Sequence, residues 1–494
     1  MNARTVSLLL LGTALAAGGV AGQPKPAAPT AATLAGAWSG TITHEGETTP
    51  FALELVPEAD GKLLVKATIP SMHLAGQAFG SFPPKVEGDT VGLGPFSFRY
   101  DAEAGTLRGV VPEDLAPVYR IPLVLRRVDR IEAPARPAPG GTLVEPVWTY
   151  EAGSALWAGP THAGGVVYVG GQDGQVHAVD ARAGRRLWVF RTGGAVRTRP
   201  TVADGSVYVP ADDGFLYKLK ASGGEVVWRV KVVERPIERL PFDNPKSRYD
   251  RFGSDVTVKD GRLYLGTHDG NVLALDAATG ARLWSFATGD AVLAAPALDS
   301  GRVYVGSFDK NVYALDATSG KLLWKRDTQG AVVSTPAVAG DRLVVGNRAY
   351  DVLGLDAGTG EVAWKRYVWF SWIESSATVR EGVAYVGSSD AAAVFAFDAA
   401  SGRRLWAADV FGWAWGQPAV TTTRVYCGTS SQAGYPAGHR AGVTALDRAA
   451  GRTVWRYEGP SADSGAFGFP GSPALGEGLV FASGLDGRLQ AFRE

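Results

Sequence analysis

Short apolar runs separated by turn residues recur along most of the chain. Within one typical stretch, the apolar runs lie at 295–298, 302–305, 311–315 and 321–324, and the turns at 299–301, 308–310 and 317–320. Runs that are rich in β-branched and aromatic residues and bounded by Gly, Asp and Ser are typical of short strands joined by tight turns. The pattern therefore predicts groups of four short antiparallel strands.

Tryptophans mark the frame of a repeat that begins at position 148. They are Trp148, Trp188, Trp228, Trp284, Trp324, Trp364, Trp406 and Trp455, with spacings of 40, 40, 56, 40, 40, 42 and 49 residues. Four short strands in a period of about 40 residues are typical of a β-propeller blade. Seven complete units lie between 148 and 455, and the eighth lacks only its outermost strand. Residues 143–148 would supply that strand and remove an exposed sheet edge, so the sequence predicts an all-β protein with an eight-bladed propeller at 143–494.

The first part of the chain does not carry the repeat. Alternating apolar positions and turn residues at 34–128 predict a small antiparallel β-sheet or half-barrel, which we interpret as an accessory domain. Pro-rich segments at 23–33 and 129–142 are interpreted as linkers. Residues 1–22 combine a short polar start, an apolar run and small residues at the end, which is the pattern of a signal peptide. We therefore expect a soluble periplasmic or secreted protein.

Composition narrows the classes of partner and site. The 49 basic and 49 acidic side chains balance, which argues against binding to nucleic acid. Cys427 is the single cysteine, so the chain has no intramolecular disulfide and no Cys-rich metal site. No cysteine follows the signal segment to carry a lipid anchor, and no other segment is long and apolar enough for a membrane span.

The repeat resembles a known family through one motif. The spacing Ala-x-Asp-x-x-x-Gly-x-x-x-Trp occurs at Ala178/Asp180/Gly184/Trp188, Ala274/Asp276/Gly280/Trp284, Ala314/Asp316/Gly320/Trp324, Ala396/Asp398/Gly402/Trp406 and Ala445/Asp447/Gly451/Trp455. It is similar to the tryptophan docking motif of pyrroloquinoline quinone (PQQ) repeat propellers. The glycine permits a turn, and the flat indole packs between neighbouring sheets, so we assign the eight tryptophans a structural docking role. The second blade departs most, with Lys218 and Lys220 ahead of its glycine and Trp228.

Three insertions indicate which end of the ring is functional. Two lengthen the loop from an outer strand to the next inner strand, at 229–255 and 456–472, and the third lengthens a turn between second and third strands, at 430–442. Because strands alternate in direction, all three insertions are expected at the same end. Binding residues are often found on loops that a rigid scaffold positions, so this end is the candidate functional face.

Aligning the inner strands predicts a cluster of side chains at the channel mouth. The register four residues before the inner-strand proline position is apolar in every blade, whereas the registers three and one residues before it are mixed, as expected when one side of a strand packs and the other faces a channel. The predicted cluster consists of Trp157, Arg197, Arg199, Arg251, Asp255, Trp372, Glu374, Trp413, Trp415 and Gln417. Two interpretations remain open. The cluster forms an arginine-bearing aromatic pocket for an anionic or planar ligand or a peptide, or Arg197 or Arg199 pairs with Asp255 or Glu374 and plugs the channel.

The resemblance implies two functions. Quinoprotein alcohol dehydrogenases share the eight blades, which implies PQQ held by a disulfide between adjacent cysteines and by calcium. That disulfide is impossible here, and the six histidines show no metal-ligand spacing. The propeller lipoprotein of the outer-membrane protein assembly machinery also resembles the chain, which implies scaffolding of a protein partner. We therefore expect an exported, non-catalytic binding or scaffolding propeller with no cofactor and an envelope or secreted protein as partner. A quinoprotein oxidoreductase with PQQ and Ca²⁺ remains the alternative.

Overall fold

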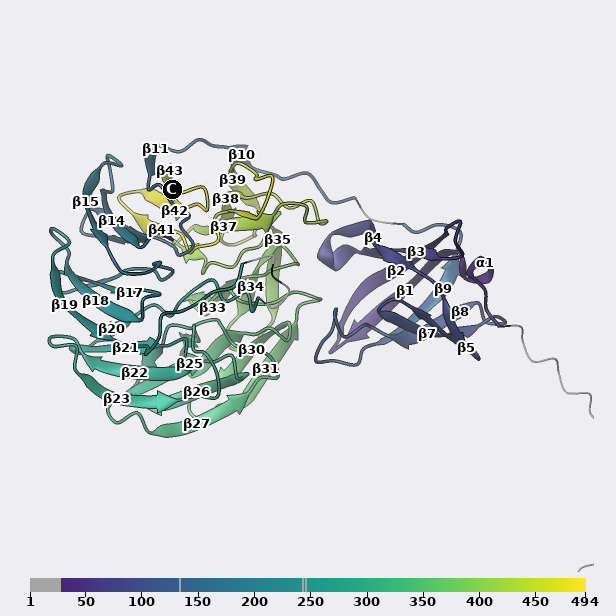
Figure 1. Ribbon diagram of the computed structural model, residues 1–494, viewed down its shortest axis with the longest axis horizontal. Helices are drawn as coiled ribbons and strands as arrows, with labels where there is room; N and C mark the ends of the chain where they lie inside the picture. Colours follow the sequence, from purple (N-terminus) through teal and green to yellow (C-terminus); the bar gives the residue numbers. More distant parts are fainter. Residues whose placement is uncertain (1–27, 133–134, 242–243, 245–246) are drawn as a thin grey trace, which may run out of the picture.

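The computed structural model describes residues 28–132, 135–241, 244 and 247–494. The predicted signal peptide at 1–22 and the first part of the predicted linker at 23–33 therefore lie outside the described residues. The described chain forms a nine-stranded curled sheet followed by eight small sheets in a ring (Figure 1). This architecture confirms the prediction of an all-β protein with an eight-bladed propeller and an N-terminal half-barrel.

The half-barrel is one antiparallel sheet that remains open between its edge strands. Its elements are α1 (Ala31–Leu34), β1 (Gly36–His44), β2 (Glu47–Pro57), β3 (Leu63–Ile69), the 3₁₀ turn η1 (Pro70–Met72), β4 (Leu74–Phe82), β5 (Lys85–Glu87), β6 (Thr90–Leu93), β7 (Phe96–Asp101), β8 (Thr106–Val110) and β9 (Pro122–Val128). The strand order is β4-β3-β2-β1-β9-β8-β7-β6-β5. Alternate side chains such as Trp38, Phe51 and Phe98 are fully buried on its concave side, as the period of two predicts.

The propeller consists of eight sheets, which we number as blades I–VIII in chain order and describe from inner to outer strand. Blades I–IV are β12 (Thr161–Ala163), β13 (Val166–Gly170), β14 (Gln175–Asp180), β15 (Arg186–Arg191); β16 (Thr201–Ala203), β17 (Ser206–Pro210), β18 (Phe215–Lys220), β19 (Val226–Lys231); β20 (Thr257–Lys259), β21 (Arg262–Gly266), β22 (Asn271–Asp276), β23 (Arg282–Ala287); and β24 (Ala297–Asp299), β25 (Arg302–Gly306), β26 (Asn311–Asp316), β27 (Leu322–Asp327).

Blades V–VIII are β28 (Ala337–Ala339), β29 (Arg342–Gly346), β30 (Asp351–Asp356), β31 (Val362–Tyr367); β32 (Thr378–Arg380), β33 (Val383–Gly387), β34 (Ala393–Asp398), β35 (Arg404–Asp409); β36 (Ala419–Val420), β37 (Arg424–Gln432), β38 (Gly442–Asp447), β39 (Thr453–Glu458); and β41 (Ala474–Gly476), β42 (Leu479–Ser483), β43 (Arg488–Arg493), β11 (Trp148–Glu151). Two further strands join blade VII, namely β10 (Thr142–Leu143) beside β39 and β40 (Ala466–Gly468) beside β37.

The ring closes between the two ends of the repeat region. Strand β11 pairs antiparallel with β43, with Trp148 opposite Ala491. The closing strand therefore begins at Trp148, later than the predicted 143–148. Pro146 has no amide hydrogen to donate to a ladder, and upstream of it β10 pairs in parallel with β39 of blade VII. The N-terminal end of the propeller thus contacts two blades.

The docking tryptophans connect each blade to the next. In the regular case, Nε1 of Trp284 donates to the carbonyl oxygen of Ala317 at 3.1 Å, and a Cβ on Gly320 would lie 2.6 Å from the same indole. Equivalent indole bonds run from Trp148 to Ala181, Trp188 to Ala221, Trp324 to Ala357, Trp364 to Ala399 and Trp406 to Arg448. We call the eight tryptophans and these partners the docking ring.

The structure of blade II explains why its sequence departs from the tryptophan docking motif. Lys218 stands where other blades have alanine, and its Nζ donates to the carbonyl of Ala277 at 2.8 Å. By analogy with the other blades this carbonyl is the acceptor for Trp228, and the Trp228 Nε1 is buried without a hydrogen-bond partner. The lysine therefore replaces the indole as donor across this blade interface.

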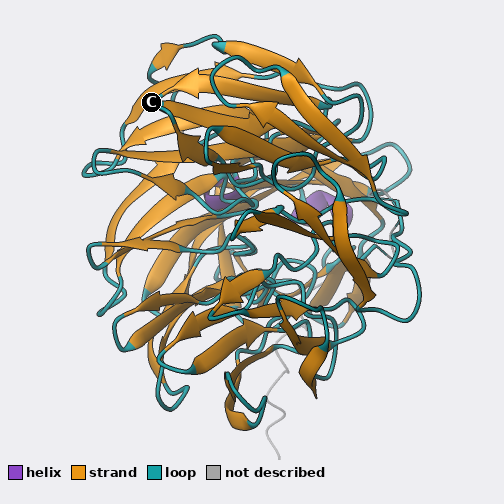
Figure 2. Cartoon of the chain, turned by 90° about the vertical axis from the view of Figure 1, so that its left-hand side faces the viewer, coloured by secondary structure: helices purple, strands orange, loops and turns teal. Residues whose placement is uncertain are grey.

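One end of the ring carries the half-barrel and the insertions. We call this end the upper face; it holds the turns between second and third strands and the loops that lead to the next inner strand. Tyr119 of the half-barrel donates to Asp351 Oδ2 at 2.7 Å, and Lys365 pairs with Glu45. Tyr367 also packs into the half-barrel core. The half-barrel lies beside the ring in Figure 1 and behind it in Figure 2.

Candidate functional site

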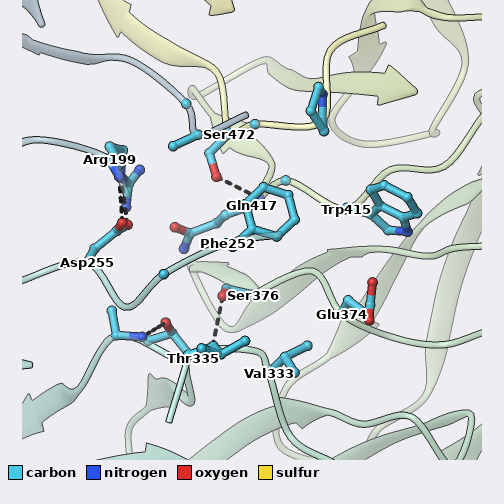
Figure 3. A pocket seen from close by; sticks show the side chains of 18 of the residues that line it. Arg199, Phe252, Asp255, Val333, Thr335, Glu374, Ser376, Trp415, Gln417 and Ser472 are labelled. Carbon is cyan, nitrogen blue, oxygen red and sulfur yellow. Dashed lines mark hydrogen bonds and ion pairs between the residues drawn. The ribbon is translucent and has the colours of Figure 1, made fainter. Parts of the chain in front are cut away.

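A pocket lies inside the ring and receives side chains from all eight blades. We call it the channel pocket; its empty space, part of which is open to solvent, is about 730 Å³. Its walls are the two mixed registers of the inner strands, joined by residues of the upper face (Figure 3). They comprise Ala158, Gly159, Arg197, Arg199, Tyr249, Asp250, Phe252, Gly253, Asp255, Leu293, Ala295, Val333, Thr335, Arg348, Glu374, Ser376, Trp415, Gly416, Gln417, Pro470, Gly471 and Ser472.

The apolar register, four residues before the proline position, packs between the blades, with one exception. Leu156, Val292, Val332 and Ile373 are fully buried. Phe252, which the alignment also places in this register, is instead part of the pocket wall. It follows the long insertion of blade III, so its strand approaches the channel differently from the others.

Hydrogen bonds between neighbouring blades form a belt around the channel pocket. They run from the backbone amides of Arg199, Ala295, Thr335 and Gln417 to the side chains of Asp255, Thr335, Ser376 and Ser472 respectively, at 2.7–3.1 Å. Blades VIII and I approach too closely for any side chain, because a Cβ on Gly159 would lie 2.1 Å from the Ser472 carbonyl oxygen. This register therefore holds the inner edge of the ring together.

Asp255 combines this structural contact with an ion pair. Its Oδ2 lies 3.4 Å from Nε of Arg199, the neighbour whose backbone amide it also binds. Burial inside the ring raises the pKa of Asp255, although the arginine opposes the shift. This pair is one that the channel-plug interpretation predicts, and Figure 3 shows it on one side of the pocket.

Glu374 pairs with an arginine that the sequence did not single out. Arg348 Nε donates to Glu374 Oε1 at 2.6 Å, and the side chains of both residues are largely buried. The same guanidinium donates to the carbonyls of Arg248 and Tyr249 at 2.7 and 3.1 Å. Arg348 therefore ties the blade III insertion to blades V and VI.

Arg197 lies in a cluster that is rich in positive charge. Its Nε donates to Asp212 Oδ2 at 3.1 Å, but Asp212 also accepts from Arg239 on both oxygens, at 3.0 and 2.9 Å. Burial, together with the charges of Arg239 and Arg251, lowers the pKa of Arg197 to about 10. Arg197 is 7% exposed, and its Nη1 is buried without a hydrogen-bond partner.

A second pocket opens at the upper face next to the channel pocket, with about 710 Å³ of empty space, part of which is open to solvent. We call it the aromatic pocket; it is lined by Tyr249, Arg251, Phe252, Trp372, Glu374, Ser389, Asp390, Trp413, Trp415, Gln432 and Tyr435. Trp413 and Trp415 stack with centroids 4.8 Å apart and planes 12° apart. Asp390 accepts from Trp413 Nε1 at 3.1 Å and from the Tyr435 hydroxyl. Burial raises the pKa of Asp390, although both hydrogen bonds oppose the shift.

Nine of the ten predicted channel-mouth residues line one of these two pockets. The channel pocket receives Arg197, Arg199, Asp255, Glu374, Trp415 and Gln417, and the aromatic pocket receives Arg251, Trp372, Trp413 and again Glu374 and Trp415. Trp157 lines neither; it packs edge-on against Phe252 at 6.3 Å, with the Arg197 guanidinium 5.9 Å from its ring.

The residues missed by the sequence reasoning follow a third register. The position twelve residues after the inner-strand proline position holds Gln172, Asp212, His268, Phe308, Arg348, Ser389, Ser430 and Leu485. Its backbone amide donates to the segment that leads into the inner strand of the same blade, as from Asp212 to the Ala195 carbonyl and from Arg348 to the Ala331 carbonyl. Aligning these turns would therefore have found Asp212 and Arg348. Arg239, Tyr249 and Tyr435 come from the insertions.

The residues present do not fit a calcium-held quinone. Over the described residues, no three His, Cys, Asp or Glu side chains are grouped so that they could hold a metal ion. Asp255 and Glu374 are each engaged by an arginine. Cys427 is fully buried in blade VII, where burial raises the pKa of its thiol to about 12.

Comparisons with known proteins place the chain in a family. The family model described as outer membrane protein assembly factor BamB matches residues 141–241, 216–370 and 368–494. Solved structures with a similar fold include BamB from Moraxella catarrhalis, which is 19% identical with a TM-score of 0.53; the match covers 71% of this chain and 97% of that chain. The computationally designed Ika8 protein is 17% identical with a TM-score of 0.57, and the match covers 72% of this chain and 100% of that chain. Quinohemoprotein alcohol dehydrogenase from Comamonas testosteroni is also similar, at 16% identity with a TM-score of 0.52; the match covers 71% of this chain and 76% of that chain.

The comparison with curated proteins finds no match. In the part of the chain that the structure describes, no helix has the length and apolar character of a membrane span. The family model covers well over half of the chain, and the fold agrees with it. The chain belongs to the PQQ-repeat propeller family of the outer membrane protein assembly factor BamB.

Proposed function

We propose that this protein is an exported, non-catalytic scaffold of the cell envelope that binds a protein partner at its upper face. The observation that carries the proposal is that two of the three insertions line the aromatic pocket and the third pairs with the strand beside it. Tyr249 comes from the first insertion, and Gln432 and Tyr435 come from the turn of blade VII. The blade VIII insertion contributes β40, which pairs with β37 beside them.

The aromatic pocket has the composition of a protein-binding hot spot. Trp, Tyr and Arg dominate such sites because they bury a large area and still hydrogen-bond. The pocket is also held rigid, since Asp390 fixes Trp413 and Tyr435, and Arg348 fixes the backbone at Tyr249. A rigid site loses little conformational entropy when a partner binds.

The family supplies the class of partner. Its description names an outer membrane protein assembly factor, so we propose that the partner is a component of outer-membrane protein assembly. The predicted signal peptide at 1–22 agrees with action outside the cytoplasm. A quinoprotein activity is not proposed, because Asp255 and Glu374 of the channel pocket are each paired with an arginine and Asp250 is paired with His268.

Gene deletion tests this proposal. Deleting the gene in the source bacterium should lower the amounts of β-barrel outer-membrane proteins, measured by quantitative mass spectrometry of isolated membranes. The wild-type gene should restore them, whereas Tyr249→Ala combined with Trp415→Ala should not. Leu323→Ala is the matched control, because Leu323 is exposed on an outer strand of blade IV. Unchanged barrel proteins after deletion would exclude the assembly role.

A further inference from the structure

The strongest unexplained feature of the aromatic pocket is Asp390, in the turn between β33 and β34. It lies thirteen residues after the inner-strand proline position. In four other blades the aspartate at this position accepts from the backbone amide two residues later, at 3.0–3.1 Å; these are Asp173, Asp213, Asp309 and Asp486. The equivalent aspartates therefore satisfy their own turns.

The turn of blade VI releases its aspartate from this role. It is one residue longer, at 388–392, than the turn of blade IV at 307–310. Ser388 binds the next strand instead, because its Oγ accepts from the Ala393 amide at 3.0 Å and donates to the Ala393 carbonyl at 2.8 Å. Asp390 is left to line the aromatic pocket.

The Asp390 carboxylate has neutral donors but no cation. Trp413 Nε1 and the Tyr435 hydroxyl both donate to Oδ1. Among the ion pairs of the described chain, none includes Asp390. Arg251 lines the same pocket but makes contacts of its own, including a hydrogen bond to Ser247 Oγ at 3.3 Å. A largely buried carboxylate is unfavourable in its ionised form without a partner of opposite charge, so a cationic ligand would stabilise Asp390.

The second oxygen, Oδ2, is the atom that a ligand can contact. Neither neutral donor bonds to it. The buried oxygen atoms without a partner in the described chain include Oδ1 of Asp351, but they do not include Oδ2 of Asp390. This oxygen therefore keeps accessible surface at the wall of the pocket.

The geometry of the carboxylate favours an ammonium group over a guanidinium group. A guanidinium binds a carboxylate most strongly through parallel hydrogen bonds to both oxygens, and Oδ1 of Asp390 already accepts two. An ammonium is a compact charge that can donate to Oδ2 alone. The walls formed by Trp372, Trp413 and Trp415 suit the apolar methylene stem of a lysine.

We propose that the aromatic pocket receives a lysine side chain of the protein partner, with its ammonium group donating to Oδ2 of Asp390 and its methylene stem packed against the tryptophans. This inference rests on the proposed function and specifies which side chain of the partner is recognised. It makes Asp390, which the sequence reasoning did not single out, the residue that determines specificity at the upper face.

Short peptides test the inference on the full mature chain. The probes are acetyl-Gly-Lys-Gly-amide and its counterparts with norleucine or arginine in place of lysine. Burial and the negative charge of Glu374 raise the pKa of Asp390, so the titrations are made at pH 8, where its ionisation is favoured and lysine remains charged. The reporter is the indole N–H signal of Trp413 among the 14 tryptophans in ¹⁵N NMR, identified by its loss in Trp413→Phe.

We expect the lysine peptide to shift this signal and to bind about tenfold more tightly than the norleucine peptide, because only lysine can form a charge-assisted hydrogen bond. The arginine peptide should bind more weakly than the lysine peptide. n-Butylammonium, which is the lysine side chain without its backbone, should compete with the lysine peptide, whereas n-butanol should not.

Two variants connect the preference to Asp390. Asp390→Asn removes the charge but keeps an oxygen that can accept from Trp413 and Tyr435, and it should reduce the lysine-over-norleucine preference to about twofold or less. Asp309→Asn is the matched control, because Asp309 has the equivalent position in blade IV and lines neither pocket; it should keep the full preference. Melting temperatures show whether each variant folds, and the competition by n-butylammonium in the wild type keeps the test valid if Asp390→Asn does not.

Other outcomes overturn the inference. These are equal affinity for the lysine and norleucine peptides, no shift of the Trp413 signal, arginine binding as tightly as lysine, or an unchanged preference in Asp390→Asn. The proposed function is judged separately in the deletion strain. If Asp390→Asn restores barrel proteins while the Tyr249→Ala, Trp415→Ala variant does not, the scaffold stands and the lysine site is wrong. If the peptides behave as expected but deletion leaves barrel proteins unchanged, the lysine site stands and the assembly role is wrong.

Discussion

The docking ring and the channel mouth connect the same eight blades in opposite ways. In the docking ring one contact is repeated, with an indole donating to a carbonyl on the next blade, as from Trp148 to Ala181 and from Trp324 to Ala357. At the channel mouth the belt of amide hydrogen bonds is repeated, but each arginine–carboxylate pair occurs once. Arg197 pairs within its own blade with Asp212, whereas Arg348 of blade V pairs with Glu374 of blade VI.

This difference separates the determinants of the fold from those of the site. A repeated contact specifies how any blade joins its neighbour, and the loss of one copy leaves the others intact. A contact made once specifies a single place on the ring. The molecule therefore maintains its architecture at the outer strands and varies its chemistry at the inner ones.

The largest expected effect is on stability, and it separates the two regions. Trp284→Ala should destabilise the chain by about 3–5 kcal/mol, because it leaves a cavity over Gly320 and removes one of the hydrogen bonds that the Ala317 carbonyl accepts. Trp415→Ala should cost clearly less, about 1–2 kcal/mol, because that indole borders two open pockets. Urea unfolding followed by far-UV circular dichroism measures both. Equal losses of stability would contradict the division between fold and site.

Most of the fold could be predicted from the sequence because its determinants are local and repeated. The spacing of Trp188, Trp284 and Trp324 sets the period, and the turn glycines set where each outer strand begins. The ring closure followed from an eighth blade that lacked one strand. The exact closing strand did not, since pairing of β10 with blade VII depends on where the chain leaves the half-barrel.

The sequence predicted which residues surround the channel pocket, but only some of the contacts that these residues make. Alignment of the inner strands placed Arg199, Asp255 and Glu374 around one pocket. It could not find the partner of Glu374, because Arg348 lies in a turn of another blade and meets it only when the ring forms. Side chains from an insertion, such as Arg239, have no equivalent in other blades, so no alignment can place them.

A fall in pH should lower the stability of the upper face, because the ring nitrogens of His439 are buried there. Burial, assisted by Arg136 and His73, lowers the pKa of His439 to about 3, and both of its ring nitrogens are buried without a partner. An unfolded histidine titrates near 6.5. Between these values the unfolded chain binds more protons, so stability is full above pH 6.5 and falls as the pH falls. At pH 5 the loss from His439 should be about 2 kcal/mol.

The matched variants isolate this loss from other titrations. Urea midpoints at pH 7 and pH 5 should differ less in His439→Phe than in the wild type. Leu323→Ala, at an exposed position of blade IV, should retain the wild-type difference. Asp351 acts in the opposite direction, because burial raises its pKa to about 6, so the folded chain gains stability as the pH falls from 6 towards 3.8. If His439→Phe leaves the pH dependence unchanged, His439 is not the group that titrates.

The smallest expected effect is at blade II, where the indole of the docking ring does not donate to the next blade. In the wild type the Trp228 Nε1 has no partner, because Lys218 donates to the Ala277 carbonyl in its place. Trp228→Phe should therefore lose packing area but no hydrogen bond. In a Lys218→Ala background the carbonyl becomes available and the indole can donate to it as in the other blades, so the same substitution should cost about 1 kcal/mol more. A double-mutant cycle on urea midpoints measures this coupling, and Trp324→Phe, whose indole already donates to Ala357, shows the full cost in an otherwise unchanged chain. A coupling of zero would mean that Lys218 only fills space beside Trp228. The docking ring would then be stabilised by the packing of the indole rings and not by their hydrogen bonds.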